Sequence, residues 1–407
     1  MNKGNLLLAQ SGGATAVINA SAVGVIRQAI ASKAFDKVLC AHFGINGILK
    51  EDFYDVSDIS ETELDILART PASAFGSCRY KLPPIQDNAE VYANIAGVLE
   101  KYNVTCLAYN GGNDSMDTCN KISDYFTRIN FPCKVVGVPK TVDNDLDCTH
   151  YCPGYGSASK YIATTMEEIA LDTSVYEKGR ITICEIMGRD TGWLTAACSV
   201  ANKAGHGPDL IYLPEREFNI DDFLSKSEQV YRKKGHCLVA ISEGVKNANG
   251  YVGADERTDS FDHVQLGGVA SKLCNLVSLK LGINTRAIDL SLPQRAAAHI
   301  LSLRDQQDAI LCGKHAVRLA LDGKTGVMAT IEIEDGRTVC RDVPLHKVAN
   351  AVKRVPQKYI SQDGAHITPL FDEYILPLID GQVQLEYEYG IPRYFDNSKL
   401  KKLSVKH

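Results

Sequence analysis

A chain of 407 residues, 45% hydrophobic and 23% charged, has the composition of a globular protein and is long enough for two domains. The formal net charge of -5 gives no indication of a nucleic-acid partner, and no stretch approaches the ~20 apolar residues that predict a membrane span. Thirteen cysteines without a C-x-x-C pair, and an apolar run within residues 1–8 that is too short for a signal peptide, indicate reduced thiols in a cytoplasmic enzyme.

One pattern recurs up to about residue 245: a short apolar run, a loop containing Gly, Asp, Asn or Glu, and a helix-like segment. The apolar runs lie at residues 6–9, 38–42, 106–109, 135–138, 181–186, 210–213 and 237–241. Apolar residues at helical spacing mark residues 14–31, 91–102, 266–282 and 299–321. Strands that alternate with helices favour parallel sheets covered by helices. We therefore predict an α/β fold with mostly parallel sheets, and the length of the chain allows two such domains.

The pattern changes after about residue 323. Two alternating strand-like runs, 327–333 and 338–343, flank Glu334-Asp335-Gly336, a good hairpin turn. From Val355 onward the sequence is rich in Tyr, Pro and Lys, and we expect an appendage packed on the surface.

Two glycine-containing loops stand between predicted strands and helices. In Ser11-Gly12-Gly13 and in Gly111-Gly112-Asn113-Asp114-Ser115, backbone N–H groups could hold a phosphate. Glycine also serves simply to turn the chain, and the second loop is equally compatible with a ligand-free helix start capped by Ser115. The motifs G-x-G-x-x-G and G-x-x-x-x-G-K-[ST] are absent, which disfavours dinucleotide-binding and P-loop proteins. Asp114 would repel a bare phosphate, so an intervening Mg²⁺ is expected.

Residues 139–147, Pro-Lys-Thr-Val-Asp-Asn-Asp-Leu-Asp, follow a predicted strand. Loops at this end of a strand form the ligand crevice of a doubly wound sheet, although Asp and Asn are also ordinary residues of a solvated turn. Asp143 and Asp145 would point the same way in an extended loop, so one could accept a proton while the other positions the attacking hydroxyl or a metal. Lys140 and Thr141 would supply a positive charge and a donor. Together these groups favour phosphoryl transfer.

Basic side chains suited to an anionic substrate occur at Arg79, Arg189, Arg286 and Arg295. A single arginine is more often a surface charge than a ligand. Arg189 is the strongest candidate, because it follows a predicted strand and Gly188 at the sheet edge where ligands bind.

Taken together, the motifs resemble the phosphofructokinase family, and most closely its pyrophosphate-dependent branch, over about residues 5–343. The resemblance rests on segments in family order: Gly12-Gly13, 76–79, 111–115, 139–146, 153–157, 187–189, Pro214-Glu215, Thr285-Arg286 and Gln294-Arg295. It implies reversible phosphoryl transfer from pyrophosphate to the 1-hydroxyl of fructose 6-phosphate, with Mg²⁺. It also implies two Rossmann-like three-layer α/β/α domains with the active site in the cleft between them. The donor-binding domain would comprise residues 1–152 plus 293–345, and the sugar-phosphate-binding domain would comprise residues 153–292 plus 346–407, with the appendage. The active site would be shared between subunits of a homodimer or homotetramer.

The resemblance implies that Asp143 is the catalytic base, with Asp145, Thr141 and Lys140 beside it. Pyrophosphate would be held by Gly12, Gly13, Arg79, Gly112, Asn113, Asp114, Ser115 and Lys140, and Mg²⁺ by Asp114 and Asn113. Fructose 6-phosphate would be held by Thr141, Asp143, Met187, Gly188, Arg189, Glu215 and Arg295, with Arg180 and Arg286 reaching the sugar phosphate of a neighbouring subunit.

Two positions favour pyrophosphate over ATP as the donor. The resemblance implies that ATP-using relatives have glycine where this chain has Asp114 and Lys140. A carboxylate about 4 Å from an α-phosphate costs on the order of 4 kcal/mol at an effective dielectric constant of about 20, or roughly a thousandfold in binding. Lys140, conversely, offers pyrophosphate a positive contact.

The chain departs from the family at two positions, and alternative functions stay open. Asn113 stands where much of the family has Asp, so Asp114 or Asp143 could take over as metal ligand, and Leu292 replaces a His that bacterial ATP enzymes use on the sugar phosphate. The alternatives are an ATP-dependent phosphofructokinase, a pyrophosphate-dependent sedoheptulose 7-phosphate kinase and a non-catalytic sugar-phosphate sensor. A nicotinamide dehydrogenase is disfavoured by the missing fingerprint.

Overall fold

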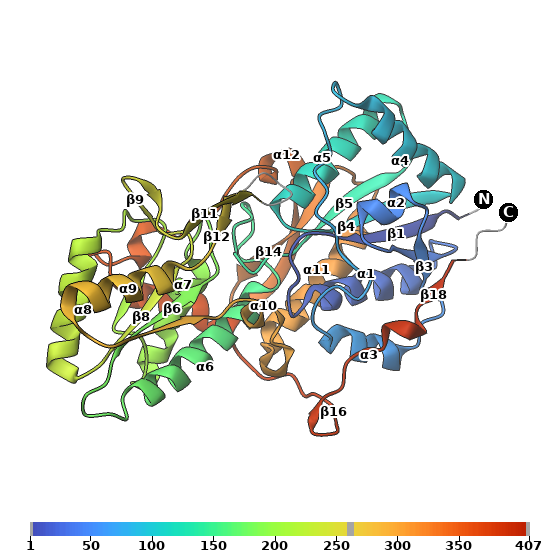
Figure 1. The fold of residues 1–407 in the computed structure, drawn as a ribbon. Coiled ribbons are helices and arrows are strands. Elements are labelled where there is room, and N and C mark those ends of the chain that lie inside the picture. The colour runs from blue at the N-terminus through green and yellow to red at the C-terminus, as the bar shows by residue number, and fades with distance from the viewer. Residues whose placement is uncertain (1–2, 259–263, 404–407) are drawn as a thin grey trace.

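The computed structural model of the chain describes residues 3–258 and 264–403. Two sheets, each covered by helices, lie side by side in it and confirm the predicted pair of α/β units (Figure 1). Among the described residues, no helix combines the length and the apolar character needed to cross a membrane.

The first sheet has the strand order β15-β14-β5-β4-β1-β2-β3-β18. Its strands are β1 (Asn5–Gln10), β2 (Val38–Ala41), β3 (Phe53–Asp55), β4 (Val104–Gly111), β5 (Lys134–Pro139), β14 (Val327–Glu334), β15 (Arg337–Pro344) and β18 (Lys401–Lys402). The five central strands, from β14 to β2, are parallel, while β15, β3 and β18 are antiparallel to their neighbours. The predicted β14–β15 hairpin is confirmed, and its turn places Asp335 and Gly336 at φ 49° and 73°.

Both faces of the first sheet are buried, as the side chains of β1 show. Leu6 and Leu8 belong to one apolar cluster, whereas Leu7 and Ala9 belong to the cluster on the other face. Helices α1 (Ile18–Ser32), α3 (Glu61–Arg69) and α11 (Leu303–Leu321) cover the first face. Helices α2 (Ile45–Leu49), α4 (Ala89–Lys101), α5 (Asn113–Arg128) and α12 (Leu345–Val348) cover the second. The result is a three-layer unit whose parallel strands direct their carboxyl ends toward the second unit (Figure 1).

The second unit contains a parallel four-stranded sheet of order β13-β6-β8-β7. Its strands are β6 (Ile181–Ile186), β7 (Leu210–Tyr212), β8 (Cys237–Ser242) and β13 (Thr285–Asp289). Helices α6 (Tyr155–Thr173) and α7 (Trp193–Ala197) pack on one face, and α8 (Ile220–Lys234) and α9 (Val269–Leu281) pack on the other. The short elements β9 (Lys246–Asn247), β10 (Gly250–Tyr251), β11 (Ala254–Thr258), β12 (Val264–Leu266) and α10 (Pro293–Ala296) complete the connections.

The C-terminal segment corrects two expectations. It is no surface appendage, because Phe371, Ile375 and Leu378 are buried in the main core. Nor does all of it belong to the second unit, since β18 pairs with β3 in the first sheet. Besides β18, it contains α13 (Asp372–Ile375), the hairpin of β16 (Tyr387–Glu388) and β17 (Ile391–Pro392), and short 3-10 helices at Gln357–Tyr359, Pro369–Phe371, Leu376–Leu378 and Asn397–Lys399. The segment therefore joins the two units instead of decorating one of them.

Candidate active site

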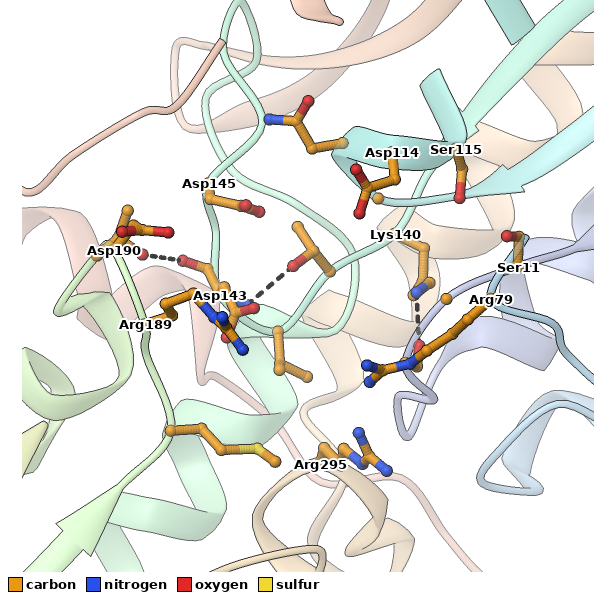
Figure 2. Close-up of a pocket in the computed structure, with 18 of the residues that line it drawn as sticks. Ser11, Arg79, Asp114, Ser115, Lys140, Asp143, Asp145, Arg189, Asp190 and Arg295 are labelled. Carbon is orange, nitrogen blue, oxygen red and sulfur yellow. Dashed lines mark hydrogen bonds between the residues drawn. The ribbon is translucent and has the colours of Figure 1, made fainter. Parts of the chain in front are cut away.

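A cavity of about 450 Å³ lies between the two units, at the carboxyl ends of β1, β4 and β5 on one side and of β6 and β8 on the other (Figure 2). Most of the residues predicted from the sequence line it: Gly12, Gly13, Arg79, Gly112, Asn113, Asp114, Ser115, Lys140, Thr141, Asp143, Asp145, Met187, Arg189 and Arg295. Other residues also line the cavity, although the sequence did not predict them as site residues: Ser11, Ala14, Tyr80, Val142, Asp190, Thr191, Glu243, Asn350 and Val352.

The loop after β1 brings two cations close to its backbone. Gly12 has φ 79°, and a Cβ atom there would lie 3.3 Å from the Lys140 ammonium. A Cβ atom on Gly13 would lie 3.3 Å from Nη1 of Arg295. The two glycines thus leave room for positive groups, which an anionic ligand needs. Helix α1 begins at Ile18, not at residue 14 as predicted, so its N-terminus is set back from this loop.

The loop after β4 leads directly into α5, whose N-cap residue is Gly112. No side chain caps this helix, so its first backbone N–H groups lie at the cavity together with the positive end of the helix dipole. Ser115 lies within the first turn, so the expectation that it caps the helix is wrong. A Cβ atom on Gly111 would come within 2.1 Å of the Ser115 hydroxyl, which explains the glycine there.

The acidic loop after β5 is held in place by short polar contacts. The Lys140 ammonium donates to the carbonyl oxygen of Gly13 at 2.5 Å. The Asp143 N–H donates to Oγ1 of Thr141 at 3.1 Å, and the Thr191 hydroxyl donates to the Asp143 carbonyl at 3.0 Å (Figure 2). Because Thr191 comes from the second unit, the backbone of Asp143 is fixed by both halves of the molecule.

The charges in this loop influence one another. Burial raises the pKa values of Asp143 and Asp145, and the proximity of Asp145 and Glu243 raises that of Asp143 further. Burial lowers the pKa of Lys140 to about 8, although the charges of Asp143 and Asp145 act in the opposite direction. A carboxylate with a raised pKa beside a buried ammonium is suited to accepting a proton from a substrate hydroxyl.

Arginines surround the same space. Arg79, Arg189 and Arg295 lie around Asp143 and Lys140 in the close-up view (Figure 2). The positive charge of Arg295 lowers the pKa of Asp143 and so favours its ionised form. The cavity therefore combines a candidate base with positive groups from both units, which suits two anionic substrates.

Four predicted sugar-binding residues do not line this cavity. Glu215 accepts hydrogen bonds from the N–H groups of Gly192, at 2.9 Å, and Val355, at 3.0 Å, so its carboxylate is engaged with backbone. Arg180 and Arg286 line a separate hollow of about 220 Å³ on the second unit. Gly188 adjoins the cavity instead of lining it, and its N–H donates to Glu243 at 3.1 Å.

Asn113 has contacts that its sequence position did not reveal. Its Oδ1 accepts from the N–H of Asn350 at 2.8 Å, and its Nδ2 donates to the Ala351 carbonyl. The amide that was expected to bind metal therefore holds a distant part of the chain. Among the cavity residues that were not predicted, Glu243 could have been found from the sequence, because it directly follows the strand β8. No sequence pattern marks Asn350 as a cavity residue.

Similarity to known proteins identifies the family of this chain. A profile of the family described as "Phosphofructokinase" matches residues 5–320. The chain is 45% identical to the pyrophosphate–fructose 6-phosphate 1-phosphotransferase of Xanthomonas campestris pv. campestris, covering 100% of this chain and 98% of the relative. It is 40% identical to the enzyme of the same name from Halomonas elongata, over 97% and 96% of the two chains. The crystal structure of a pyrophosphate-dependent phosphofructokinase from Nitrosospira multiformis superposes with a TM-score of 0.90 at 36% identity, over 100% and 99% of the chains. This chain therefore belongs to the phosphofructokinase family.

Proposed function

We propose that this protein transfers a phosphoryl group reversibly from pyrophosphate to the 1-hydroxyl of fructose 6-phosphate, giving fructose 1,6-bisphosphate and orthophosphate. The observation that carries the proposal is the presence of Asp143, Lys140 and Asp114 in one cavity. They supply a base, a cation for the donor and a carboxylate that disfavours a longer donor. The names of the full-length relatives support the same reaction.

Asp143 takes the proton in the forward direction. Its carboxylate accepts the hydrogen of the 1-hydroxyl while the hydroxyl oxygen attacks one phosphorus atom of pyrophosphate. The bond from that phosphorus to the bridging oxygen breaks, and orthophosphate leaves. In the reverse direction, protonated Asp143 returns the hydrogen to the sugar oxygen. The raised pKa makes this carboxylate a stronger base than an ordinary aspartate and allows it to hold the proton between steps.

Lys140 and Arg79 hold the donor in this proposal, together with the backbone N–H groups at the start of α5. The hydrogen bond from Lys140 to Gly13 keeps the ammonium at the glycine loop. Asp114, in the first turn of α5 beside this proposed donor site, would repel the α-phosphate of ATP. Pyrophosphate has no third phosphate and avoids this repulsion.

Mg²⁺ would be held by Asp114 and Asp145. This ion usually binds one or two carboxylates and completes its coordination with water and substrate phosphates. Both residues line the cavity, and Oδ1 of Asp145 is buried without a hydrogen-bond partner among the described residues, so it is available to a cation. When bound, the ion would offset negative charge on the transferring phosphoryl group. Asn113 is the weaker ligand, because its amide already contacts residues 350–351.

Arg189 and Arg295 would bind fructose 6-phosphate within the cavity, beside Met187. Arg180 and Arg286 would act in a second copy of the chain, as part of a homodimer or homotetramer. Their surroundings support this: Val175, Tyr176 and Leu279 on the same unit are 65%, 56% and 84% exposed. The ring centroid of Tyr176 lies 5.9 Å from Cζ of Arg180, and large exposed apolar side chains suit a surface that another subunit covers.

The test is an assay of purified protein with Mg²⁺, fructose 6-phosphate and either pyrophosphate or ATP. The proposal expects fructose 1,6-bisphosphate with pyrophosphate, and the reverse reaction with orthophosphate. Turnover with ATP alone would refute the donor assignment, and a strong preference for sedoheptulose 7-phosphate would refute the sugar assignment. Sugar-phosphate binding without turnover, with either donor, would instead support a sensor.

A further inference from the structure

Residues 350–355, called the strap below, cross from one unit to the other beside the cavity. At one end, the strap contacts the start of α5 through two hydrogen bonds between Asn113 and residues 350–351. Nδ2 of Asn350 also donates to Oδ1 of Asp117 at 3.3 Å, one turn further along the helix. Asn350 and Val352 line the cavity itself. This end of the strap is therefore attached to the loop that we propose to bind pyrophosphate.

The other end of the strap contacts the second unit. Nη1 of Arg354 donates to the carbonyl of Asp190 at 3.3 Å. The N–H of Val355 donates to Glu215 at 3.0 Å. These contacts attach the strap to the loops after β6 and β7, and Asp190 itself lines the cavity.

Lys353, in the middle of the strap, contacts the acidic loop with both its backbone and its side chain. Its N–H donates to the carbonyl of Asp145 at 2.8 Å. Its ammonium donates to Oδ1 of Asn144 at 3.3 Å and to the carbonyls of Thr149 and His150 at 3.1 and 3.0 Å. All three side-chain contacts are made to neutral oxygens within residues 144–150. The ammonium therefore links three residues of this one loop.

Asn144 connects these contacts of Lys353 to the carboxylates of Asp143 and Asp145. It is fully buried, lies between Asp143 and Asp145, and has φ 55°, a left-handed conformation that asparagine adopts more readily than most residues other than glycine. Its Oδ1 accepts from the N–H of Cys152 at 3.0 Å, and its Nδ2 donates to the Tyr374 hydroxyl at 2.7 Å. Because Tyr374 also belongs to the C-terminal segment, that segment holds Asn144 through two different side chains.

The aromatic surroundings of Lys353 keep its ammonium in this position. The ammonium lies 5.4 Å from the ring centroid of Trp193, whose Nε1 donates to the Lys353 carbonyl at 2.9 Å. An ammonium held by carbonyl dipoles and an indole ring has given up much of its hydration. An apolar side chain in its place would leave three oxygens of the acidic loop without this donor, so the ammonium holds the loop in a shape that apolar packing alone would not hold.

We propose that Lys353 is a positioning residue for phosphoryl transfer, which fixes the loop of Asp143 and Asp145 relative to the donor and sugar loops that the strap also contacts. This inference rests on the proposed function. A positioning role predicts a loss of turnover with little change in substrate affinity, because a small displacement of a catalytic group can cost about a hundredfold in rate. A packing role predicts lost stability with normal turnover in the molecules that stay folded.

Three variants separate these roles: Lys353→Met removes the charge and keeps most of the stem, Lys353→Arg keeps a charge, and Lys358→Met is the matched control. Lys358 is an exposed lysine of the same segment, and its ammonium lies 5.0 Å from the ring centroid of Tyr359. We expect Lys353→Met to lower kcat by about ten- to a hundredfold while the KM values for both substrates change by less than about threefold. Lys353→Arg should recover most of kcat, and Lys358→Met should match the wild type.

Hydrogen exchange followed by mass spectrometry provides a readout that needs no substrate. Peptides covering residues 143–152 should exchange faster in Lys353→Met, while peptides from α8 should be unchanged. If Lys353→Met does not fold, Tyr374→Phe removes a second contact to Asn144 with the charge intact, and it should show a smaller loss of kcat. Unchanged kcat, or a change in KM alone, in the folded variant would overturn the positioning role. Absence of turnover in the wild type would instead refute the proposed function.

Discussion

The Lys140 ammonium reaches across the cavity floor to the carbonyl oxygen of Gly13, at 2.5 Å. This contact joins the loop after β5 to the loop after β1, and a Cβ atom on Gly12 would crowd it. Lys140 is almost fully buried, and burial lowers its pKa to about 8. The cation that we propose to bind pyrophosphate therefore begins to lose its charge not far above neutral pH.

The pH dependence of kcat/KM should show this titration. Lysine is charged below its pKa, so kcat/KM for pyrophosphate should fall as the pH rises through about 8. On the acid side, activity should rise with pH as Asp143 ionises, at a pH above that of an ordinary aspartate. Rate measurements between about pH 5 and 10 test both limbs. In Lys140→Arg the alkaline limb should move to higher pH, and an unmoved limb would assign it to another group.

Removal of the Lys140 charge should weaken donor binding most. A hydrogen bond to a charged group contributes about 1.5–3 kcal/mol, so Lys140→Met should raise the KM for pyrophosphate by about ten- to a hundredfold. The KM for fructose 6-phosphate should change by less than about threefold, which serves as the internal control. An equal rise in both KM values would mean that Lys140→Met disturbs the whole acidic loop.

Donor choice should change only when both selecting residues are replaced. The single variants Asp114→Gly and Lys140→Gly should lose activity with pyrophosphate and gain little with ATP. In Asp114→Gly the repulsion that we estimate at about 4 kcal/mol is gone, but the Lys140 side chain still fills the space beside Gly12; the double variant removes both and should gain measurable turnover with ATP. Steady-state rates with both donors across the four proteins provide the test. A double variant inert toward ATP would show that other parts of the cavity exclude the nucleoside.

Asp143→Asn should separate activity from stability. Loss of a general base lowers kcat by about a hundred- to ten-thousandfold. In the unfolded chain Asp143 ionises near pH 4, whereas burial and its neighbours hold the proton to higher pH in the folded protein. Between about pH 4 and the raised pKa of folded Asp143, the folded wild type therefore loses stability as the pH rises, and the variant does not. Above this range the variant should be more stable by about 1 kcal/mol or more, a gain absent below about pH 4. Thermal unfolding at several pH values measures this, with exposed Asp147→Asn as the matched control.

Glu215 offers a test of a role that the resemblance implied and the geometry does not support. Its carboxylate accepts from Gly192 and Val355, so Glu215→Ala should leave two N–H groups without partners and cost about 1–3 kcal/mol of stability. Glu215→Gln keeps an acceptor oxygen and should retain both stability and the KM for fructose 6-phosphate. A large rise in that KM with an unchanged Tm would restore Glu215 as a sugar ligand.

The predictable parts of this molecule were those encoded locally. The apolar run Ile181–Ile186 is a strand with those bounds, and the Asp335-Gly336 turn forms because both residues tolerate positive φ. Cavity residues such as Lys140 and Arg189 were found because parallel strands deliver the loops that follow them to one edge.

The remaining features depend on contacts between distant parts of the chain. Nothing near Asn113 indicated that its amide would hold residues 350–351, and nothing near Lys353 indicated that its ammonium would contact the acidic loop. Strand β18 is only two residues long, so no periodicity could reveal it. Such features are set by how the two units and the C-terminal segment pack, which local pattern does not determine.

Strand β18 makes the first sheet depend on residues from both ends of the chain. Lys401 and Lys402 pair with Asp55 and Tyr54, so the edge of β3 stays uncovered until the far end of the chain has been synthesised. Domains commonly fold from the N-terminus as they leave the ribosome. The first sheet, however, is incomplete until β14 and β15 have also been synthesised. A nascent chain stalled before residue 401 would present an open strand edge, and neighbouring chains on the same polysome could pair with it.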